Sequence, residues 1–284
     1  MYQHTMMSSR ASLLRGFDPA ENDSSIEQKF FFDALKKDLL LDWLEFHFVR
    51  DPEFYCSPIL SVYYDTPSLS LYNEVRNGDY LKTKVRLRWY QREFSAGQQS
   101  VKCFLEIKQK FGARRRKRRE PITVDVQSLT GDLFSQPRIL EAPDALPEWH
   151  LLVRGILVPL LLVEYERFRF VEPYTGARIS LDSGIGCARA NCTYLAGLVP
   201  VRLSSGVLEI KSARDTLPQR LQPMGRYLRK QSFSKYASCC QFLIEHDSTY
   251  ARQNDYVKPE IKFAFAGLCN ELLLKTFGRS ATIF

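Results

Sequence analysis

Apolar and polar residues alternate with a period of two over much of this chain, which is the pattern of β-strands that bury one face. The alternation, together with β-branched and aromatic residues, predicts strands at residues 26–32, 59–64, 80–91, 101–110, 114–124, 158–171, 176–183 and 205–212. Gly97 and Gly112 lie between neighbouring strands and are typical turn residues. The chain is therefore predicted to be an α+β protein dominated by antiparallel strands.

Helical spacing, with apolar residues three or four positions apart, is confined to shorter stretches. The first begins after Asp33, a potential N-cap, and places on one face Leu35, Leu39, Leu40, Trp43 and Leu44. Further helices are predicted at residues 69–75, in part of 125–154, at 217–228, at 234–245 and around 260–275. Residues 1–24 are polar and mixed, and they are predicted to form a flexible N-terminal arm.

The strand predicted at residues 80–91 has a basic face. Because the side chains of a strand alternate between its two sides, the charged residues separate from the apolar ones. The basic side carries Lys82, Lys84, Arg86 and Arg88, and the other side carries Val85, Leu87 and Trp89. One strand of this kind is more often the solvated face of an ordinary sheet, so the functional interpretation depends on repetition.

The same arrangement recurs on later strands. The residues that share a face are Glu106, Lys108 and Lys110, then Lys117 and Arg119, then Tyr165, Arg167 and Arg169, then Arg178, Ser180 and Asp182, and finally Val207, Glu209 and Lys211. Two unit charges about 4 Å apart repel by on the order of 4 kcal/mol at an effective dielectric constant of about 20. A surface that gathers so many cations is reasonable only if it binds an anion. A linear chain of phosphates matches guanidinium and ammonium groups, so the pattern predicts a phosphate-binding tunnel.

The net charge of +8 agrees with an acidic partner, which could be nucleic acid, an anionic membrane or a polyphosphate. The basic run at residues 114–119 could by itself be a nucleic-acid patch or a nuclear localisation signal. It lies, however, between a turn and a β-like stretch, and it has little of the aromatic interleaving that stacks bases. Nucleic acid is therefore the weaker interpretation.

The seven cysteines are odd in number and include no C-x-x-C pair, which favours a reducing compartment such as the cytoplasm. The longest apolar run, residues 156–163, is far shorter than the roughly 20 residues that span a membrane. No membrane-spanning segment is therefore expected, and any export of a product would need another protein.

Several common catalytic motifs are absent from the sequence, which has no Walker loop, no H-E-x-x-H and no G-x-S-x-G. The four histidines lie outside the basic faces. Phosphoryl transfer needs none of these groups, because positioning and cations stabilise its transition state. An acceptor phosphate is already ionised at neutral pH and requires no general base.

Nine short motifs follow one another between residues 25 and 245. They are Glu27-x-Lys29, Ser61 to Thr66, Lys84 to Tyr90, Leu105 to Lys108, Lys117 to Arg119, Tyr165-x-Arg167, Arg178 to Asp182, Leu208 to Lys211 and Phe233 to Tyr236. In this order they resemble the polyphosphate polymerase (VTC) domain, a family of the CYTH or triphosphate tunnel metalloenzyme superfamily. The resemblance implies one domain over residues 25–245 and does not cover the C-terminal extension, residues 246–284.

The resemblance implies a closed antiparallel β-barrel with flanking helices, whose lumen is a triphosphate tunnel that holds a polyphosphate. ATP would donate its terminal phosphoryl group to a growing polyphosphate chain, with the help of Mn²⁺ or Mg²⁺. The residues that by position would act in this transfer are Arg86, Arg88, Lys108, Arg167, Lys211 and Lys235. Those that would bind phosphates are Lys29, Lys84, Lys117, Arg119, Tyr165, Arg178 and Ser234.

The resemblance also implies carboxylate ligands for the metal. Glu209 is the first candidate, and Glu27 and Glu106 are second choices. Asp182 would be a further ligand or would orient a nearby arginine.

Two positions depart from the family pattern. Ser25 stands where related hydrolases have an acidic ligand, which favours a polymerase over a hydrolase. Ser232 stands where the family usually has a lysine, and Lys230 could compensate for it.

Three functions remain open from the sequence. An ATP-dependent polyphosphate polymerase is favoured. The alternatives are a tunnel phosphohydrolase that acts on triphosphate or a nucleoside triphosphate, with Glu27 or Glu106 activating water, and a non-catalytic protein that binds polyphosphate or nucleic acid.

Overall fold

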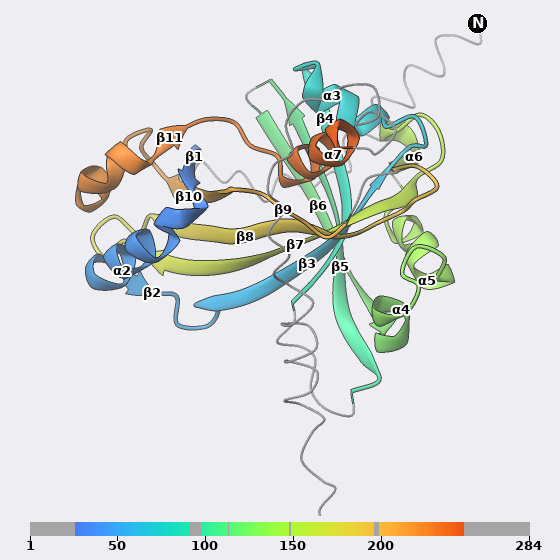
Figure 1. Cartoon of the computed structure of the whole chain (residues 1–284), viewed down its shortest axis with the longest axis horizontal. Coiled ribbons are helices and arrows are strands. Elements are labelled where there is room, and N and C mark those ends of the chain that lie inside the picture. The colour runs from blue at the N-terminus through green and yellow to red at the C-terminus, as the bar shows by residue number, and fades with distance from the viewer. Residues whose placement is uncertain (1–25, 91–97, 113, 148, 196–198, 247–284) are drawn as a thin grey trace, which may run out of the picture.

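The computed structural model describes residues 26–90, 98–112, 114–147, 149–195 and 199–246. The predicted N-terminal arm, the Gly97 turn and the helix around residues 260–275 lie outside these ranges. In the described part of the chain, an 11-stranded sheet forms the body of the fold, and helices pack against both of its faces (Figure 1).

Neighbouring strands of the sheet are antiparallel. Their order is β11 (Arg229–Lys230), β1 (Ile26–Asp33), β10 (Ser205–Ser212), β8 (Arg178–Ala190), β7 (Val158–Val171), β3 (Cys56–Asp65), β4 (Leu81–Tyr90), β5 (Ser100–Phe111) and β6 (Arg114–Asp125). Two short strands lie off this path, β2 (Val49–Arg50) beside β7 and β9 (Val201–Arg202) beside β8.

The predicted strands are confirmed, and the largest difference concerns the end of β8. The prediction ended this strand near residue 183, whereas it continues to Ala190. Gly184, with a φ of 59°, lies where the register of β8 shifts against β7. A glycine at a bulge lets the ladder continue beyond a position that resembles a strand end in the sequence.

The sheet does not close into a barrel, so this part of the fold prediction is wrong. In the residues described, β6 and β11 form the two ends of the sheet, and no backbone ladder joins β6 to β1. Side chains meet across the gap instead, because Arg115 on β6 forms an ion pair of 2.8 Å with Glu27 on β1. Glu27 also pairs with Lys29 at 2.9 Å, so the carboxylate separates two cations that direct strand pairing would bring side by side.

Apolar residues on the outer face of the sheet form two cores. One lies under β3 to β6 and contains Val85, Leu87 and Trp89, as the alternation predicted. Its covering elements are α4 (Val126–Thr130), α5 (Pro137–Leu140), η4 (Ala142–Ala145) and α6 (Trp149–Leu152). The other core lies under β1, β7, β8 and β10 and is covered by α2 (Lys37–His47) and η5 (Gln219–Tyr227). The cores leave the opposite, basic face of the strands to form the inner surface.

Two helix predictions need correction. Asp33 caps the 3-10 turn η2 (Ala34–Lys36), and α2 begins only at Lys37, so Leu35 and Leu39 are 89% and 42% exposed while Leu40 and Leu44 are buried. The stretch predicted as a helix at 217–228 forms the 3-10 helix η5, because Pro223 within it cannot donate an α-helical hydrogen bond. None of the helices described is both long and apolar enough to cross a membrane.

The helices α3 (Ser70–Arg76) and α7 (Lys235–Glu245) pack on the inner side of the sheet. They are joined through Asp65, a buried residue at the end of β3. Its carboxylate accepts hydrogen bonds from the backbone N–H groups of Thr66, Leu71 and Tyr72 at 2.6–2.8 Å and from the hydroxyl of Tyr236 on α7. Burial raises the pKa of Asp65, and these hydrogen bonds partly offset the cost of burying its carboxylate.

We expect Tyr236→Phe to lower the free energy of unfolding by about 1–3 kcal/mol, because Asp65 loses the one side-chain donor that it has among the described residues while remaining buried. Urea denaturation would measure the change. Tyr80→Phe is the matched control, since Tyr80 is exposed, and it should change stability by less than about 0.5 kcal/mol. Equal losses in the two variants would contradict a special role for the bond to Asp65.

Candidate functional site

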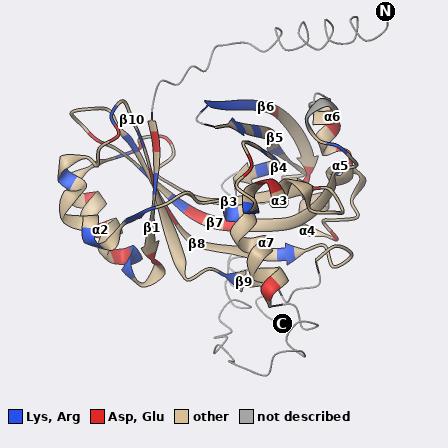
Figure 2. Ribbon diagram, turned by 90° about the horizontal axis from the view of Figure 1, so that it is seen from above, with Lys and Arg blue, Asp and Glu red and all other residues tan. Residues whose placement is uncertain are grey.

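A cavity of about 440 Å³ lies on the inner face of the sheet, which is the face that carries the predicted cations. The basic residues that line it are Lys29, Lys84, Arg86, Arg88, Lys108, Lys117, Arg119, Arg167, Arg169, Arg178, Lys211 and Lys235. The acidic residues that line it are Glu27, Asp51, Glu106 and Glu209. The lining therefore has an excess of eight positive charges. Figure 2 shows part of this charge as basic stretches along β5 and β6.

The residues predicted to act in transfer, to bind phosphates or to be the metal ligands Glu209, Glu27 and Glu106 all line this cavity. Asp182, predicted as a further ligand or an orienting residue, is buried behind the lining. Two other cations of the predicted basic faces, Lys82 and Lys110, lie outside its lining as described.

The sequence analysis missed several lining residues, among them Asp51, Phe54 and Tyr90. Tyr90 continues the alternation of Arg86 and Arg88 on β4, so the period of two could have identified it. Asp51 and Phe54 lie between β2 and β3, where no periodic pattern exists.

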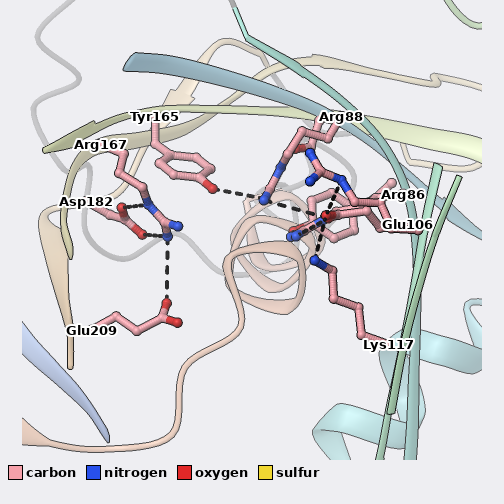
Figure 3. Close-up of polar contacts among 11 residues, drawn as sticks. Arg86, Arg88, Glu106, Lys117, Tyr165, Arg167, Asp182 and Glu209 are labelled. Carbon is pink, nitrogen blue, oxygen red and sulfur yellow. Dashed lines mark hydrogen bonds and ion pairs between the residues drawn. The ribbon is translucent and has the colours of Figure 1, made fainter. Parts of the chain in front are cut away.

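Glu106 is the centre of the first group of charges (Figure 3). Arg86 donates two hydrogen bonds to it, with its Nε at 2.7 Å from Oε2, and a third to the Tyr63 hydroxyl at 3.0 Å. The cations at 3.5–3.7 Å from the same carboxylate are Arg88, Lys117 and Arg119. Burial alone would raise the pKa of Glu106, but Arg86 and Arg88 outweigh burial and hold this pKa well below its usual range.

Asp182 is the centre of the second group (Figure 3). Asp182 is buried. Arg167 donates two hydrogen bonds to its carboxylate, of 2.6 and 2.7 Å, and the Lys235 ammonium donates a third at 2.6 Å. Burial opposes the charge on Asp182, yet these two cations keep its pKa below the usual value. Of the two roles predicted for Asp182, the contacts match orientation of the arginine rather than metal binding.

Two lysines between these groups have no ion pair among the described residues. Lys84 and Lys108 lie directly opposite each other on β4 and β5, and Lys117 is opposite Lys108 on β6. Burial, followed by the charges of Lys29 and Arg86, lowers the pKa of Lys84 to about 7. Arg86 is also the main cause that lowers the pKa of Lys108. Nearby carboxylates only partly offset these effects, so an added anion would further favour the ammonium form of both lysines.

The predicted metal ligands differ in how well they suit a metal. Glu106 does not fit, because cations already surround both of its oxygens. Glu209 lies opposite Lys29 across β1 and β10 and 3.7 Å from Arg167, and Glu27 contacts Lys29. No group of three or more His, Cys, Asp or Glu side chains that could hold a metal occurs in the described ranges. Glu27 has the same difficulty as Glu106, because Lys29 and Arg115 contact its two oxygens at 2.8–2.9 Å. Glu209 is the best candidate, and it fits a hard divalent ion only if phosphate oxygens supply the other ligands.

The start of α7 brings Ser234 and Lys235 to the cavity. Ser234 is the N-cap of the helix and accepts a hydrogen bond from the Ala237 N–H at 3.3 Å. The ring of Tyr236 stacks on that of Tyr63, with centroids 5.1 Å apart, which fixes the helix against β3. Lys230 pairs with Asp215 at 2.9 Å and does not line the cavity as described, so it does not replace the lysine missing at Ser232.

Solved structures with a similar arrangement share little sequence with this chain. One described as "putative adenylate cyclase" from Vibrio parahaemolyticus is 15% identical, with a TM-score of 0.38 over 75% of this chain and 97% of that one. Another of the same description, from Bacillus halodurans, is 13% identical, with a TM-score of 0.38 over 85% and 97%. A protein from Pyrococcus horikoshii is 12% identical, with a TM-score of 0.32 over 67% and 80%.

Membership of a family rests on the sequence match instead. No curated protein matches the chain. The VTC domain, however, matches residues 24–244, which is well over half of the chain and includes every strand of the sheet. This confirms the resemblance inferred from the motifs on those strands: the chain belongs to the VTC domain family.

Proposed function

We propose that this protein transfers the terminal phosphoryl group of ATP to a growing inorganic polyphosphate chain within the cavity, with the help of a divalent metal. The observation that carries the proposal is the excess of eight positive charges in the lining. Carboxylates balance only part of this charge, and Lys84 and Lys108 are left without one in the described structure. A chain of phosphates supplies closely spaced negative oxygens, and it would be bound by both guanidinium forks and ammonium groups.

The two buried carboxylates support this function by orienting the cations. Glu106 orients Arg86, and Asp182 orients Arg167 and Lys235, by accepting hydrogen bonds from them. These cations are therefore held in place before substrate binds. Preorganised cations are worth more to a transition state than mobile ones, because they need no rearrangement as charge develops. A divalent metal, when bound, would neutralise charge on the transferring phosphoryl oxygens.

Transfer to a phosphate is better supported than hydrolysis. Hydrolysis needs a base for water, and the sequence offered Glu27 or Glu106. Cations hold the pKa of Glu106 well below its usual range in spite of burial, which makes it a weak base. Glu27 is occupied by Lys29 and Arg115 at 2.8–2.9 Å. An acceptor phosphate requires neither group.

A cytoplasmic site of action belongs to the same proposal. The seven cysteines of the sequence are odd in number and include no C-x-x-C pair, which agrees with a reducing compartment, where ATP is also available.

Inorganic tripolyphosphate should stabilise the folded protein. At about 100 times its dissociation constant it should raise the free energy of unfolding by about 2.7 kcal/mol. Urea denaturation with and without the anion would measure this, and sodium chloride at equal ionic strength is the control. Because the attraction is electrostatic, the effect should shrink as salt is added. No stabilisation by tripolyphosphate at low salt would remove the basis of the proposal.

Binding of tripolyphosphate near pH 8 should take up protons. In the protein without ligand, Lys84 has its pKa lowered to about 7 and is mostly neutral at this pH. A neighbouring phosphate would favour its ammonium form. Affinity should therefore fall as pH rises above about 7. Calorimetry in buffers of different ionisation enthalpy would measure the uptake. Lys84→Met should reduce it, whereas Lys36→Met, outside the cavity lining, should not; equal uptake in both variants would exclude Lys84 as the acceptor.

Incubation with ATP and Mn²⁺ should yield polyphosphate chains that can be sized on a gel. Glu209→Gln should abolish this synthesis, because it removes the best metal ligand, but it should leave tripolyphosphate binding nearly unchanged. Glu141→Gln, on the outer side of the protein, is the matched control and should retain synthesis. Release of phosphate without long products would favour the hydrolase. Tripolyphosphate binding with neither product would favour the binding protein.

A further inference from the structure

The cross-strand register arranges the inner side chains of β4, β5 and β6 in parallel rows. From one end of the strands to the other, the rows are Lys82, Lys110 and Arg115, then Lys84, Lys108 and Lys117, then Arg86, Glu106 and Arg119, and then Arg88, Phe104 and Pro121. Successive rows are two residues apart, which is roughly 6.8 Å along a strand. The inner surface therefore changes along the strands. The row of Lys82, Lys110 and Arg115 is entirely cationic, whereas the row at the other end contains the aromatic ring of Phe104.

The aromatic end is built around Phe104, which interrupts the alternation of charges on β5. The guanidinium carbon of Arg119 lies 3.6 Å from the centre of the Phe104 ring. Tyr90, the next inner residue on β4 after Arg88, makes an edge contact with the same ring at 6.3 Å between centroids. Glu106 is 3.7 Å from the Arg119 Nε and helps to orient the guanidinium. The position and plane of Arg119 are therefore set by its neighbours.

Arg119 and Tyr90 both line the cavity, and the side chain of Arg119 is 38% exposed. Because Phe104 covers one face of the guanidinium plane, the other face is available to a flat group that enters the cavity. A phosphate does not need such a surface, since it binds the edge of a guanidinium through N–H groups rather than its face. A planar, electron-rich ring can use the face of the guanidinium, because bases stack on guanidinium groups and on aromatic rings.

We propose that Arg119, held flat on Phe104 and flanked by Tyr90, is the stacking site for the base of the nucleotide donor. This inference rests on the proposed function for its phosphate sites and assigns Arg119 a role different from phosphate binding. The row of Lys84, Lys108 and Lys117 is the next row along the strands, roughly 6.8 Å away, so a nucleotide could place its base on Arg119 and its phosphates among the cations. The chain of phosphates would then extend toward Lys82, Lys110 and Arg115.

Arg119→Lys tests the proposal because it keeps the positive charge and removes the planar stacking surface. Calorimetry on the full chain should show that the dissociation constant for magnesium ATP rises by about five- to tenfold, the lower part of the range for base stacking. The dissociation constant for inorganic tripolyphosphate should stay within about twofold, since the charge is unchanged.

Phe104→Leu provides a second variant, because it removes the ring that supports the guanidinium without touching any charge. It should weaken magnesium ATP and spare tripolyphosphate in the same way. Lys108→Gln is the matched control, because Lys108 lines the cavity on the same strand as Phe104 and belongs to the phosphate-binding row. It should weaken both ligands by the same factor and leave the ratio of their dissociation constants unchanged.

The proposal would be overturned if both ligands lost affinity equally in Arg119→Lys and Phe104→Leu, or if neither did. It would also be overturned if the unaltered protein bound magnesium ATP and the magnesium complex of methyl triphosphate, which has the same charge and no base, equally well. Each of these results would leave the phosphate cavity intact. Failure of the unaltered protein to bind either ligand would instead reject the proposed function itself.

Discussion

Mutual repulsion among the basic side chains of the cavity is the constraint on which the rest of the structure depends. Strands from both halves of the sheet direct lysines and arginines into the same space, and the acidic residues there neutralise only a third of them. The fold resolves part of the problem with two buried carboxylates, Glu106 and Asp182, each shared by several cations at 2.5–3.7 Å. Lys84 and Lys108 have no ion pair among the described residues, and the proposed substrate would supply negative charge beside them.

Favourable packing elsewhere in the fold must offset the repulsion among these charges. The outer face of the same strands provides it through two apolar cores, and part of the inner face adds a third core beneath α7. On the inner side, α7 presents Lys235 to the cavity and is anchored by Tyr236, which joins Asp65 by a hydrogen bond and stacks on Tyr63. Tyr63 in turn receives a hydrogen bond from Arg86. The packing of α7 and the placement of two site cations are therefore connected through one pair of aromatic rings.

The open edge of the sheet is bridged by charged side chains. In the residues described, no backbone ladder joins β6 to β1, and the ion pair of Arg115 with Glu27 connects these two strands by side chains alone. The ends of the inner surface also differ in character, since the cations of one end give way to Phe104 and Tyr90 at the other. The two ends of the cavity are therefore chemically different, and a chain-extending enzyme could use this difference to keep the donor at one end and the product at the other.

The sequence alone determined the strands, the side of each strand that bears charge, and most of the cations that line the cavity. A period of two is a local property of the backbone, so the alternation through Arg86, Arg88 and Trp89 was sufficient to assign faces without knowledge of the fold. Only the tertiary structure decided which charges meet. It placed Arg167 and Lys235 on Asp182 and turned Arg119 flat against Phe104, and it left the sheet open. These outcomes depend on strand twist, register and side-chain reach between residues far apart in the chain, and no local pattern encodes those distances.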